Sequence, residues 1–161
     1  MKVGQGFDAH RLVSGRTLVL GGVEIAHPQG LEGHSDGDAL LHAVSSALLG
    51  ALGEGDLGRH FPSSDPALAG IASSEILGRV AERVRDAGLR LGNLDATIIA
   101  QAPRLGAHLA KMEAVIADVL GTPVERVNVK VTSSDGLGAI GRAEGIAALA
   151  VVLLEPASGE A

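Results

Sequence analysis

The sequence predicts an α/β protein, an α+β sandwich in which a mixed sheet carries helices on its outer face. Strand-like and helix-like stretches are intermixed along the chain. The last stretch, Ile146 to Leu154, is apolar at every position, and its β-branched residues and short length favour a strand over a buried helix. Because such a strand must be covered on both faces, we expect helices on one side and another subunit on the other.

Length and composition exclude several classes of protein. The 161 residues suit one domain, expected over 1–155, with a short tail at 156–161. Thirteen Lys and Arg against nineteen Asp and Glu give a net charge of −6, which argues against a nucleic-acid partner. The longest apolar run is shorter than the ~20 residues of a membrane helix, and the first residues lack the apolar region of a signal peptide. We therefore expect a cytoplasmic protein that binds no membrane, and the absence of cysteine fits a reducing compartment.

Residue periodicity predicts the remaining elements. Strands are expected at Lys2–Phe7, at Arg16–Ile25 with a bend or bulge at Gly21-Gly22, at Leu94–Gln101 and at Val127–Val131. Helices are expected at Gly37–Ala51, at Ser74–Ala87 and at Ala107–Leu120, which Gly121 ends. Ser35 is the expected N-cap of the first helix, with Asp38 in the capping-box position.

Asp8, His10 and His42 form the candidate metal site. Asp8 and His10 are two residues apart in a strand-like segment, so their side chains point to the same face. His42 lies on the first predicted helix. Two imidazoles and a carboxylate are typical ligands of a catalytic zinc ion, which keeps its fourth position for water or substrate. Spacing alone leaves ordinary surface or core histidines as the alternative.

Polar side chains also gather where other predicted elements begin or end. The run from His34 to Asp38 precedes the first helix, whose free N–H groups favour an anion, although capping explains most of this run. In the segment from Lys130 to Asp135, a predicted strand ends and is followed by hydroxyl side chains and a carboxylate. The following glycines match G-x-G-x-x-G but lack the helix and strand of a dinucleotide site, so we expect a tight loop there.

In order and spacing these motifs resemble the 2-C-methyl-D-erythritol 2,4-cyclodiphosphate synthase family over about Lys2 to Leu154. The resemblance is carried by Gly4-x-Gly6-Phe7-Asp8-x-His10-Arg11, the run from Gly30-Leu31 through Gly33-His34-Ser35-Asp36-Gly37-Asp38 to His42-Ala43, Gly55-Asp56-Leu57-Gly58, His60-Phe61-Pro62, Gln101-x-Pro103, Leu137-Gly138 and Gly141-Arg142-x-Glu144-Gly145. It implies a homotrimer whose sheets pack around a threefold axis, with active sites between subunits.

The resemblance also implies a reaction of non-mevalonate isoprenoid biosynthesis. The 2-phosphate of 4-diphosphocytidyl-2-C-methyl-D-erythritol 2-phosphate attacks the β-phosphorus, expels CMP and closes 2-C-methyl-D-erythritol 2,4-cyclodiphosphate. The implied cofactors are Zn²⁺ at Asp8, His10 and His42, and Mg²⁺ or Mn²⁺ on the diphosphate with help from Asp135. Cations suit this chemistry because the two phosphates repel each other and charge builds on the transferring group.

The implied catalytic donors are His34 and Ser133, beside the reacting phosphates. The implied substrate contacts are Asp8, His10, His34, Ser35, Asp56, Leu57, Gly58, Phe61, Pro62, Ser63, Ser64, Asp65, Ala100, Gln101, Ala102, Pro103, Arg104, Leu105, Gly106, Val131, Thr132, Ser133, Ser134, Asp135 and Arg142. Some positions depart from the family pattern. Asp135 stands where glutamate is typical, so we expect the second metal to bind through water, and Ser133 and Ser134 replace threonines.

Two alternatives stay open at this point. The first is a metal-dependent phosphohydrolase, in which the same ligands activate water. Its product would be free CMP without a cyclic diphosphate. The second is a non-catalytic trimer that binds an isoprenoid diphosphate in the central cavity, where Phe7 and Arg142 could contribute. The complete metal triad argues against this second alternative, because a pure binding module has no need of an open zinc position.

Overall fold

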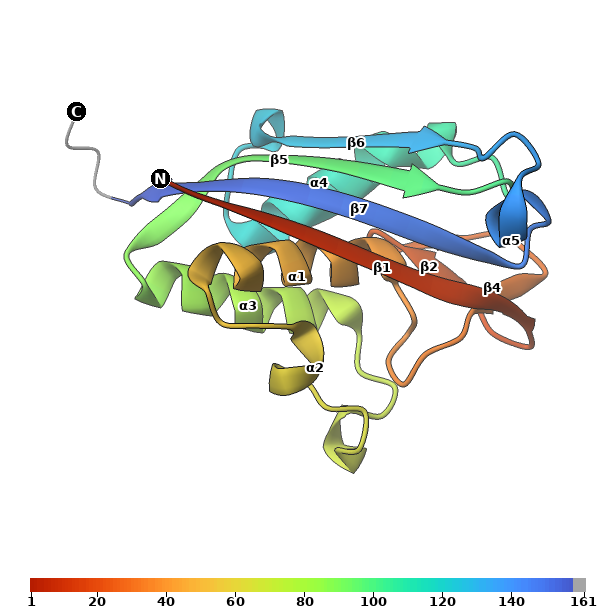
Figure 1. Cartoon of the computed structure of the whole chain (residues 1–161), viewed down its shortest axis with the longest axis horizontal. Helices are drawn as coiled ribbons and strands as arrows, with labels where there is room; N and C mark the ends of the chain where they lie inside the picture. The colour runs from red at the N-terminus through yellow and green to blue at the C-terminus, as the bar shows by residue number, and fades with distance from the viewer. Residues whose placement is uncertain (158–161) are drawn as a thin grey trace.

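A five-stranded mixed sheet is the centre of the fold (Figure 1). The computed structural model describes residues 1–157. The sheet has the order β4-β1-β7-β5-β6 and contains β1 (Lys2–Ser14), β4 (Gln29–Leu31), β5 (Leu89–Ile99), β6 (Val127–Thr132) and β7 (Gly145–Pro156). All neighbours are antiparallel except β5 and β6, which are parallel because the helix α4 (Leu109–Leu120) crosses over between them. A separate hairpin contains β2 (Leu18–Leu20) and β3 (Val23–Ile25).

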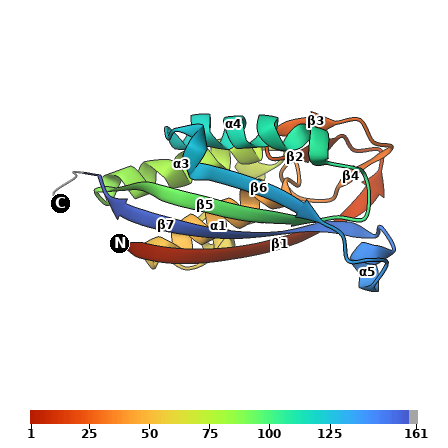
Figure 2. The same ribbon diagram turned by 90° about the horizontal axis from the view of Figure 1, so that it is seen from above.

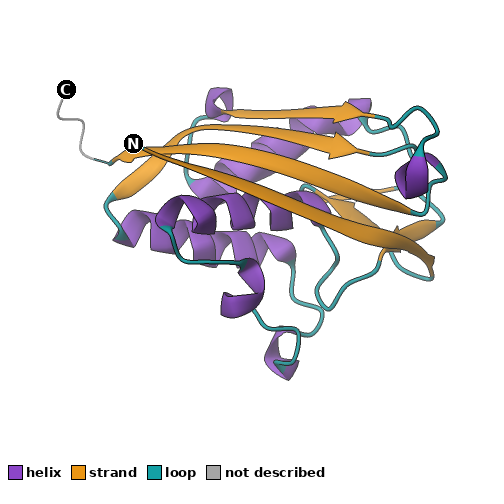
Figure 3. Cartoon of the chain, in the orientation of Figure 1, coloured by secondary structure: helices purple, strands orange, loops and turns teal. Residues whose placement is uncertain are grey.

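Three long helices cover one face of the sheet. These are α1 (Ala39–Leu52), α3 (Ser73–Asp86) and α4; in Figure 1, α4 passes behind the strands and α3 lies below α1. Figure 2 shows α3 and α4 along the same side of the strands. The loops carry the short helices α2 (Leu57–His60) and α5 (Gly138–Gly141) and the 3₁₀ turns η1 (Pro66–Leu68), η2 (Gly106–His108) and η3 (Val124–Arg126) (Figure 3). The predicted mixed sheet with helices on one face is confirmed.

Helix α1 packs directly on β1 because two glycines let the backbones approach. A Cβ atom on Gly4 would lie 1.9 Å from the carbonyl oxygen of Ala47, and one on Gly6 would lie 2.0 Å from that of Ala43. Any side chain at either position would therefore push the helix away from the strand. This close contact sets the distance between α1 and β1. The polar residues of the strand follow directly after the two glycines.

The face of the sheet away from the helices carries several exposed hydrophobic residues. Val3 and Phe7 on β1 and Leu149 and Val151 on β7 are large hydrophobic residues open to solvent in the single chain. Phe7 pairs with Leu149 in the register of the two strands, whereas Val151 pairs with Gln5, so the apolar side chains share this face with a polar one. We call these four residues the apolar face. The predicted strand with two apolar surfaces is β7, whose other side is buried under the helices.

The structure corrects the predicted start of the first helix. The N-cap of α1 is Asp38 rather than Ser35, and its carboxylate accepts the backbone N–H of Leu41 at 3.0 Å. The same carboxylate accepts N–H groups of Gly21 at 2.9 Å and Gly22 at 2.7 Å. Burial raises the pKa of this carboxyl, and the three N–H groups oppose the rise. Asp38 itself caps the helix N-terminus, and the anion site expected there stays a prediction.

Other boundaries also differ from the prediction: β1 continues to Ser14 rather than ending at Phe7, and β5 runs from Leu89 to Ile99 rather than from Leu94 to Gln101. Gly21 and Gly22 both have positive φ angles and form the tight turn of a hairpin, so the predicted single strand is two strands. The predicted loop from Ala26 to Ser35 contains β4. The predicted tail starts inside β7, which runs through Pro156, and residues 158–161 lie outside the described part of the chain. Within the described part, the helices are too short or too polar to cross a membrane.

Candidate metal centre and active site

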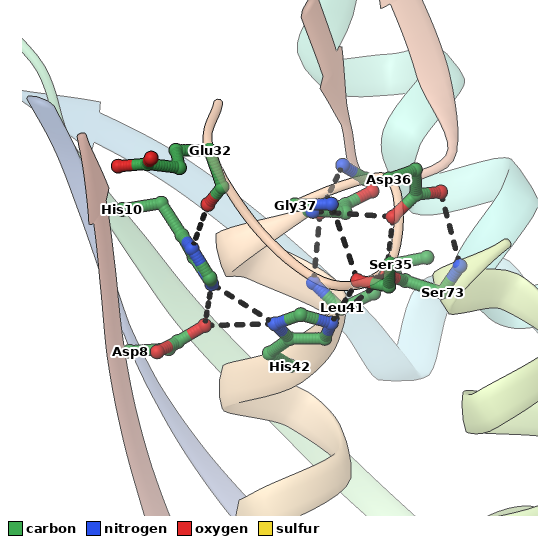
Figure 4. Close-up of polar contacts among 11 residues, drawn as sticks. Asp8, His10, Glu32, Ser35, Asp36, Gly37, Leu41, His42 and Ser73 are labelled. Carbon is green, nitrogen blue, oxygen red and sulfur yellow. Dashed lines mark hydrogen bonds and ion pairs between the residues drawn. The ribbon is translucent and has the colours of Figure 1, made fainter. Parts of the chain in front are cut away.

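Asp8, His10 and His42 bring three ligand atoms to one place (Figure 4). Asp8 Oδ2 lies 2.7 Å from His10 Nε2 and 2.9 Å from His42 Nδ1, and these two ring nitrogens are 3.1 Å apart. Among the described residues, no other group of three or more His, Cys, Asp or Glu side chains converges in this way. The geometry is therefore that of a small centre that could hold one metal ion.

Local structure explains this convergence. Asp8 and His10 follow Gly4 and Gly6 at the same alternation along β1, so their side chains point to the helix-covered face. His42 lies in the first turn of α1, where its N–H donates to the Asp38 carbonyl at 3.0 Å. Since Gly6 holds α1 against β1, the His42 ring lies over the Asp8 carboxylate. Period-two spacing in the strand and a close helix are together sufficient to build the centre.

The donor atoms suit a cation of the zinc type. His10 Nδ1–H donates to the Glu32 carbonyl at 2.5 Å, which leaves the lone pair of Nε2 directed at the centre. The Asp8 carboxylate can only accept hydrogen bonds. Its lone pairs therefore face those of the ring nitrogens unless a proton or a metal ion lies between them. Two imidazole nitrogens and one carboxylate oxygen favour zinc over magnesium or calcium, which prefer oxygen ligands alone.

The protonation of the centre is set by its own residues. Burial raises the pKa of the Asp8 carboxyl, but hydrogen bonds and positive charge from His10 and His42 outweigh it and hold this pKa well below its ordinary value. Burial lowers the pKa of the His10 imidazole, whereas the Asp8 carboxylate and the Glu32 carbonyl raise it, and the net result is a raised pKa. Asp8 therefore stays ionised, and His10 holds a proton more firmly than an ordinary histidine.

We expect zinc binding to weaken as the pH falls through neutrality. A metal ion must displace the proton of His10, whose pKa lies above the ordinary 6.5, so competition begins at a higher pH than for a free histidine. Below that pKa, the apparent affinity should fall about tenfold per pH unit for each proton displaced. A competition titration with a chelator at about pH 8 and about pH 6 measures this change. Equal affinities at the two values would contradict the assignment of His10 as a ligand.

A cavity of about 200 Å³ opens beside the metal centre. It is lined by His10, His34, Ser35, His42, Leu57, Phe61, Ser63, Leu68, Ile71 and Ile76. His34 Nε2–H donates to the Asp65 carbonyl at 3.1 Å, which joins the loop before α1 to the loop after α2. The structure thus brings the predicted residues His34, Ser35, Leu57, Phe61 and Ser63 next to the predicted metal ligands.

Two of the remaining predicted residues of this region have local structural roles. Asp56 caps α2 by accepting the N–H of Arg59 at 3.0 Å, and Asp65 caps η1 by accepting that of Ala67 at 2.9 Å. Gly58, Pro62 and Ser64 are exposed and are not part of the cavity lining. Both carboxylates keep free acceptor positions, because each cap bond uses one oxygen atom.

A second group of predicted residues lies at the ends of β5 and β6. Since these strands are parallel, their carboxyl ends meet at one edge of the sheet and enclose a cavity of about 360 Å³. It is lined by Ala100, Gln101, Pro103, Arg104, Leu105, Gly106, Val131, Thr132 and Ser133. Ala102 and Ser134 are adjacent in the chain but do not line it. Within one chain, the two groups of predicted residues line separate cavities.

Asp135 and Arg142 lie beyond this second cavity. Asp135 has a φ of 50° in the turn after β6, and its Oδ1 accepts the Ser133 hydroxyl at 3.1 Å. Arg142 follows α5, and its guanidinium pairs with the Glu144 carboxylate at 2.6 Å. Gly141 packs where a Cβ atom would lie 2.1 Å from the Gly136 carbonyl carbon, so the glycine-rich run is a tight turn closed by one helical turn.

Comparison with known proteins decides the family. The family model of the YgbB family matches residues 1–155. The chain belongs to the YgbB family. A relative from Thiobacillus denitrificans, the 2-C-methyl-D-erythritol 2,4-cyclodiphosphate synthase, is 57% identical over 155 residues, which cover 96% of this chain and 97% of that relative.

Solved structures agree with this YgbB assignment. A structure of 2C-methyl-D-erythritol-2,4-cyclodiphosphate synthase in a CDP-bound form matches with a TM-score of 0.88 and 36% identity, over 96% of this chain and all of the other. The bifunctional IspDF from Campylobacter jejuni matches with a TM-score of 0.93 and 41% identity over 96% of this chain, which spans 42% of that longer protein. The predicted family resemblance is confirmed.

The structure of this YgbB-family chain also reveals a pair of polar residues that the sequence did not connect with the metal ligands. The Ser73 hydroxyl lies 2.9 Å from His42 Nε2, and the Asp36 carboxylate lies 2.5 Å from that hydroxyl. In the sequence, Ser73 resembles an ordinary residue at a helix start, and Asp36 resembles a loop residue. Only the packing of α3 against the loop before α1 brings them together.

Proposed function

We propose that this chain is a 2-C-methyl-D-erythritol 2,4-cyclodiphosphate synthase, a phosphorus–oxygen lyase of isoprenoid biosynthesis, with residues 1–155 acting as one domain. The observation that carries the proposal is the convergence of Asp8, His10 and His42 beside a cavity, in a chain 57% identical to a relative of that name. A cytoplasmic location remains a prediction.

The reaction would join two phosphates of one substrate molecule. An oxygen of the 2-phosphate attacks the β-phosphorus, the bond from that phosphorus to the α-phosphate oxygen breaks, and CMP leaves with this oxygen. Zn²⁺ at the Asp8–His10–His42 centre, with Mg²⁺ or Mn²⁺ on the diphosphate near Asp135, would offset the repulsion between the phosphates and the charge on the leaving CMP. No protein nucleophile is needed.

Each of the two cavities would bind a different part of the substrate. His34 and Ser133 would donate hydrogen bonds to the reacting phosphates, and Asp56 would hold the erythritol hydroxyls. The loop from Phe61 to Asp65 would close over this part of the substrate. The segment 100–106 and the end of β6 would hold the cytidine, since their cavity of about 360 Å³ has a size typical of small-molecule sites. Arg104 is the cationic side chain in its lining.

A homotrimer with active sites between subunits would unite these two cavities. Two observations support it. The apolar face would be covered by neighbouring subunits around a threefold axis, and the metal centre and the cytidine cavity are separate within one chain. In this arrangement, the metal centre of one subunit lies opposite the cytidine cavity of the next. An isoprenoid diphosphate in the central cavity, near Phe7 and Arg142, stays a subsidiary prediction.

Phosphorus NMR of the purified protein with the cytidylyl substrate tests the function. We expect cyclic diphosphate and CMP in equal amounts, no product after a chelator has removed the metal ions, and recovery when zinc and magnesium are restored. Release of CMP with a linear product would instead support the phosphohydrolase. A bound but unreacted substrate would support the non-catalytic trimer. The relatives reported above carry the name of the synthase and support neither alternative.

A further inference from the structure

The His42 ring has polar partners on both of its nitrogen atoms. Nδ1 faces Asp8 and His10 in the metal centre. Nε2 points the other way, to the Ser73 hydroxyl at 2.9 Å and the Ser35 hydroxyl at 3.1 Å, and both serines are buried (Figure 4). A ligand histidine must keep the proton off its metal-facing nitrogen, so the partners of Nε2 decide whether His42 can bind a cation.

A hydroxyl alone cannot decide this, because it can donate or accept. Asp36 removes the ambiguity for Ser73, the nearer of the two hydroxyls to His42 Nε2. Its carboxylate only accepts hydrogen bonds, so the Ser73 hydroxyl donates its proton to Asp36 Oδ1 at 2.5 Å. The Ser73 oxygen is then left to accept the proton of His42 Nε2. With the proton on Nε2, the lone pair of Nδ1 faces the metal centre.

We propose that Asp36 and Ser73 are positioning residues, which act through His42 and fix its Nε2–H tautomer and ring orientation for metal binding. The proposal rests on the metal site described above. It gives His42 the same arrangement that His10 obtains from the Glu32 carbonyl, with a serine and a carboxylate in place of the backbone acceptor. Outer partners of this kind orient ligand histidines in metal sites generally.

Capping accounts for only part of this arrangement. Helix α3 has no side-chain cap from its own N-cap residue, Ala72, and Asp36 Oδ2 accepts the Ser73 N–H at 3.0 Å instead. That bond would hold α3 whether or not the Ser73 hydroxyl existed. The hydroxyl itself bridges Oδ1 of Asp36 to the His42 ring, which a cap does not require. Removing the hydroxyl therefore separates the two roles.

Ser73→Ala is the direct test, with Ser45→Ala as the matched control. Ser45 is also a buried serine, on α1, and its hydroxyl has no hydrogen-bond partner among the described residues. Zinc affinity of each metal-free protein is measured by competition with a chromogenic chelator. We expect Ser73→Ala to bind zinc about 10- to 100-fold more weakly, with little change in the unfolding temperature of the metal-free protein, and Ser45→Ala to match wild type.

Asp36→Asn tests the direction of the hydrogen bonds. Its amide oxygen can still accept the Ser73 N–H, while its NH₂ group now donates to the Ser73 hydroxyl and turns the hydroxyl proton toward His42. We expect a loss of zinc affinity of about tenfold or more. Nitrogen-15 NMR of zinc-loaded protein should show a metal-bound Nδ1 and an exchange-protected Nε2–H at His42 in wild type, and loss of that protection in Ser73→Ala.

The outcomes separate two failures. Wild-type affinity in Ser73→Ala or in Asp36→Asn would overturn the proposal while leaving the metal site intact. So would an affinity loss that the Ser45→Ala control shares. Absence of zinc binding in the wild-type protein would instead remove the metal site and, with it, the proposed function.

Discussion

Replacing His42 with alanine is expected to abolish zinc binding and turnover together. The ring supplies one of three protein ligands. After its loss, Asp8 and His10 alone are too few ligands to hold the cation. We expect the zinc affinity to fall by more than about 100-fold and the turnover by about 10³-fold or more. Chelator competition measures the first quantity, and phosphorus NMR of product formation measures the second.

His27→Ala is the matched control for this experiment. His27 lies beside the β2–β3 hairpin, and its Nδ1–H donates to the Gln29 carbonyl at 2.9 Å. We expect this variant to bind zinc and form product at wild-type rates. The secondary structure and the assembly of His42→Ala should be retained, because α1 is held by apolar packing along its whole length. Full turnover in His42→Ala would remove the proposed mechanism.

Val151→Asp is expected to break the homotrimer and, with it, the activity. Val151 belongs to the apolar face, so a new carboxylate there would lie against an apolar neighbour subunit, beside Asp95, whose charge is already paired with Lys130. An unpaired charge in such an interface costs about 3 to 5 kcal/mol, and threefold symmetry repeats the cost three times. Sedimentation should show single chains, and the rate should fall by at least about 10²-fold because the two cavities no longer face each other.

Val124→Asp is the control for the trimer prediction. Val124 is 43% exposed, close to the 47% of Val151, but lies on η3 at the helix-covered side of the sheet. The same change in charge and volume there should leave assembly and turnover unchanged. If Val151→Asp remained a trimer, the apolar face would not be the subunit interface. If it became a single chain with full activity, the active site would not lie between subunits.

The metal ligands could be predicted because their geometry depends on local rules. Asp8 and His10 share a face of β1 through the period of two, and His42 is fixed by the first turn of α1. The strand assignment of β7 followed in the same way, from its composition. The sheet order could not be read from these patterns, because the pairing of β7 between β1 and β5 is a long-range choice.

The errors occurred where a tertiary contact overrides a local pattern. Ser35 has the residue type and spacing of an N-cap, but its hydroxyl faces His42, and Asp38 takes the cap because it also satisfies the turn between β2 and β3. Asp36 and Ser73 are 37 residues apart, and nothing in their local sequence indicates that they meet. The outer partners of a metal ligand are therefore a property of the fold.

The most direct measurement is anomalous diffraction at the zinc absorption edge from crystals of the zinc-loaded protein. One difference peak should lie about 2 Å from each of Asp8 Oδ2, His10 Nε2 and His42 Nδ1 in every subunit. A peak elsewhere, or three side chains directed away from a common point in the presence of zinc, would contradict the central claim.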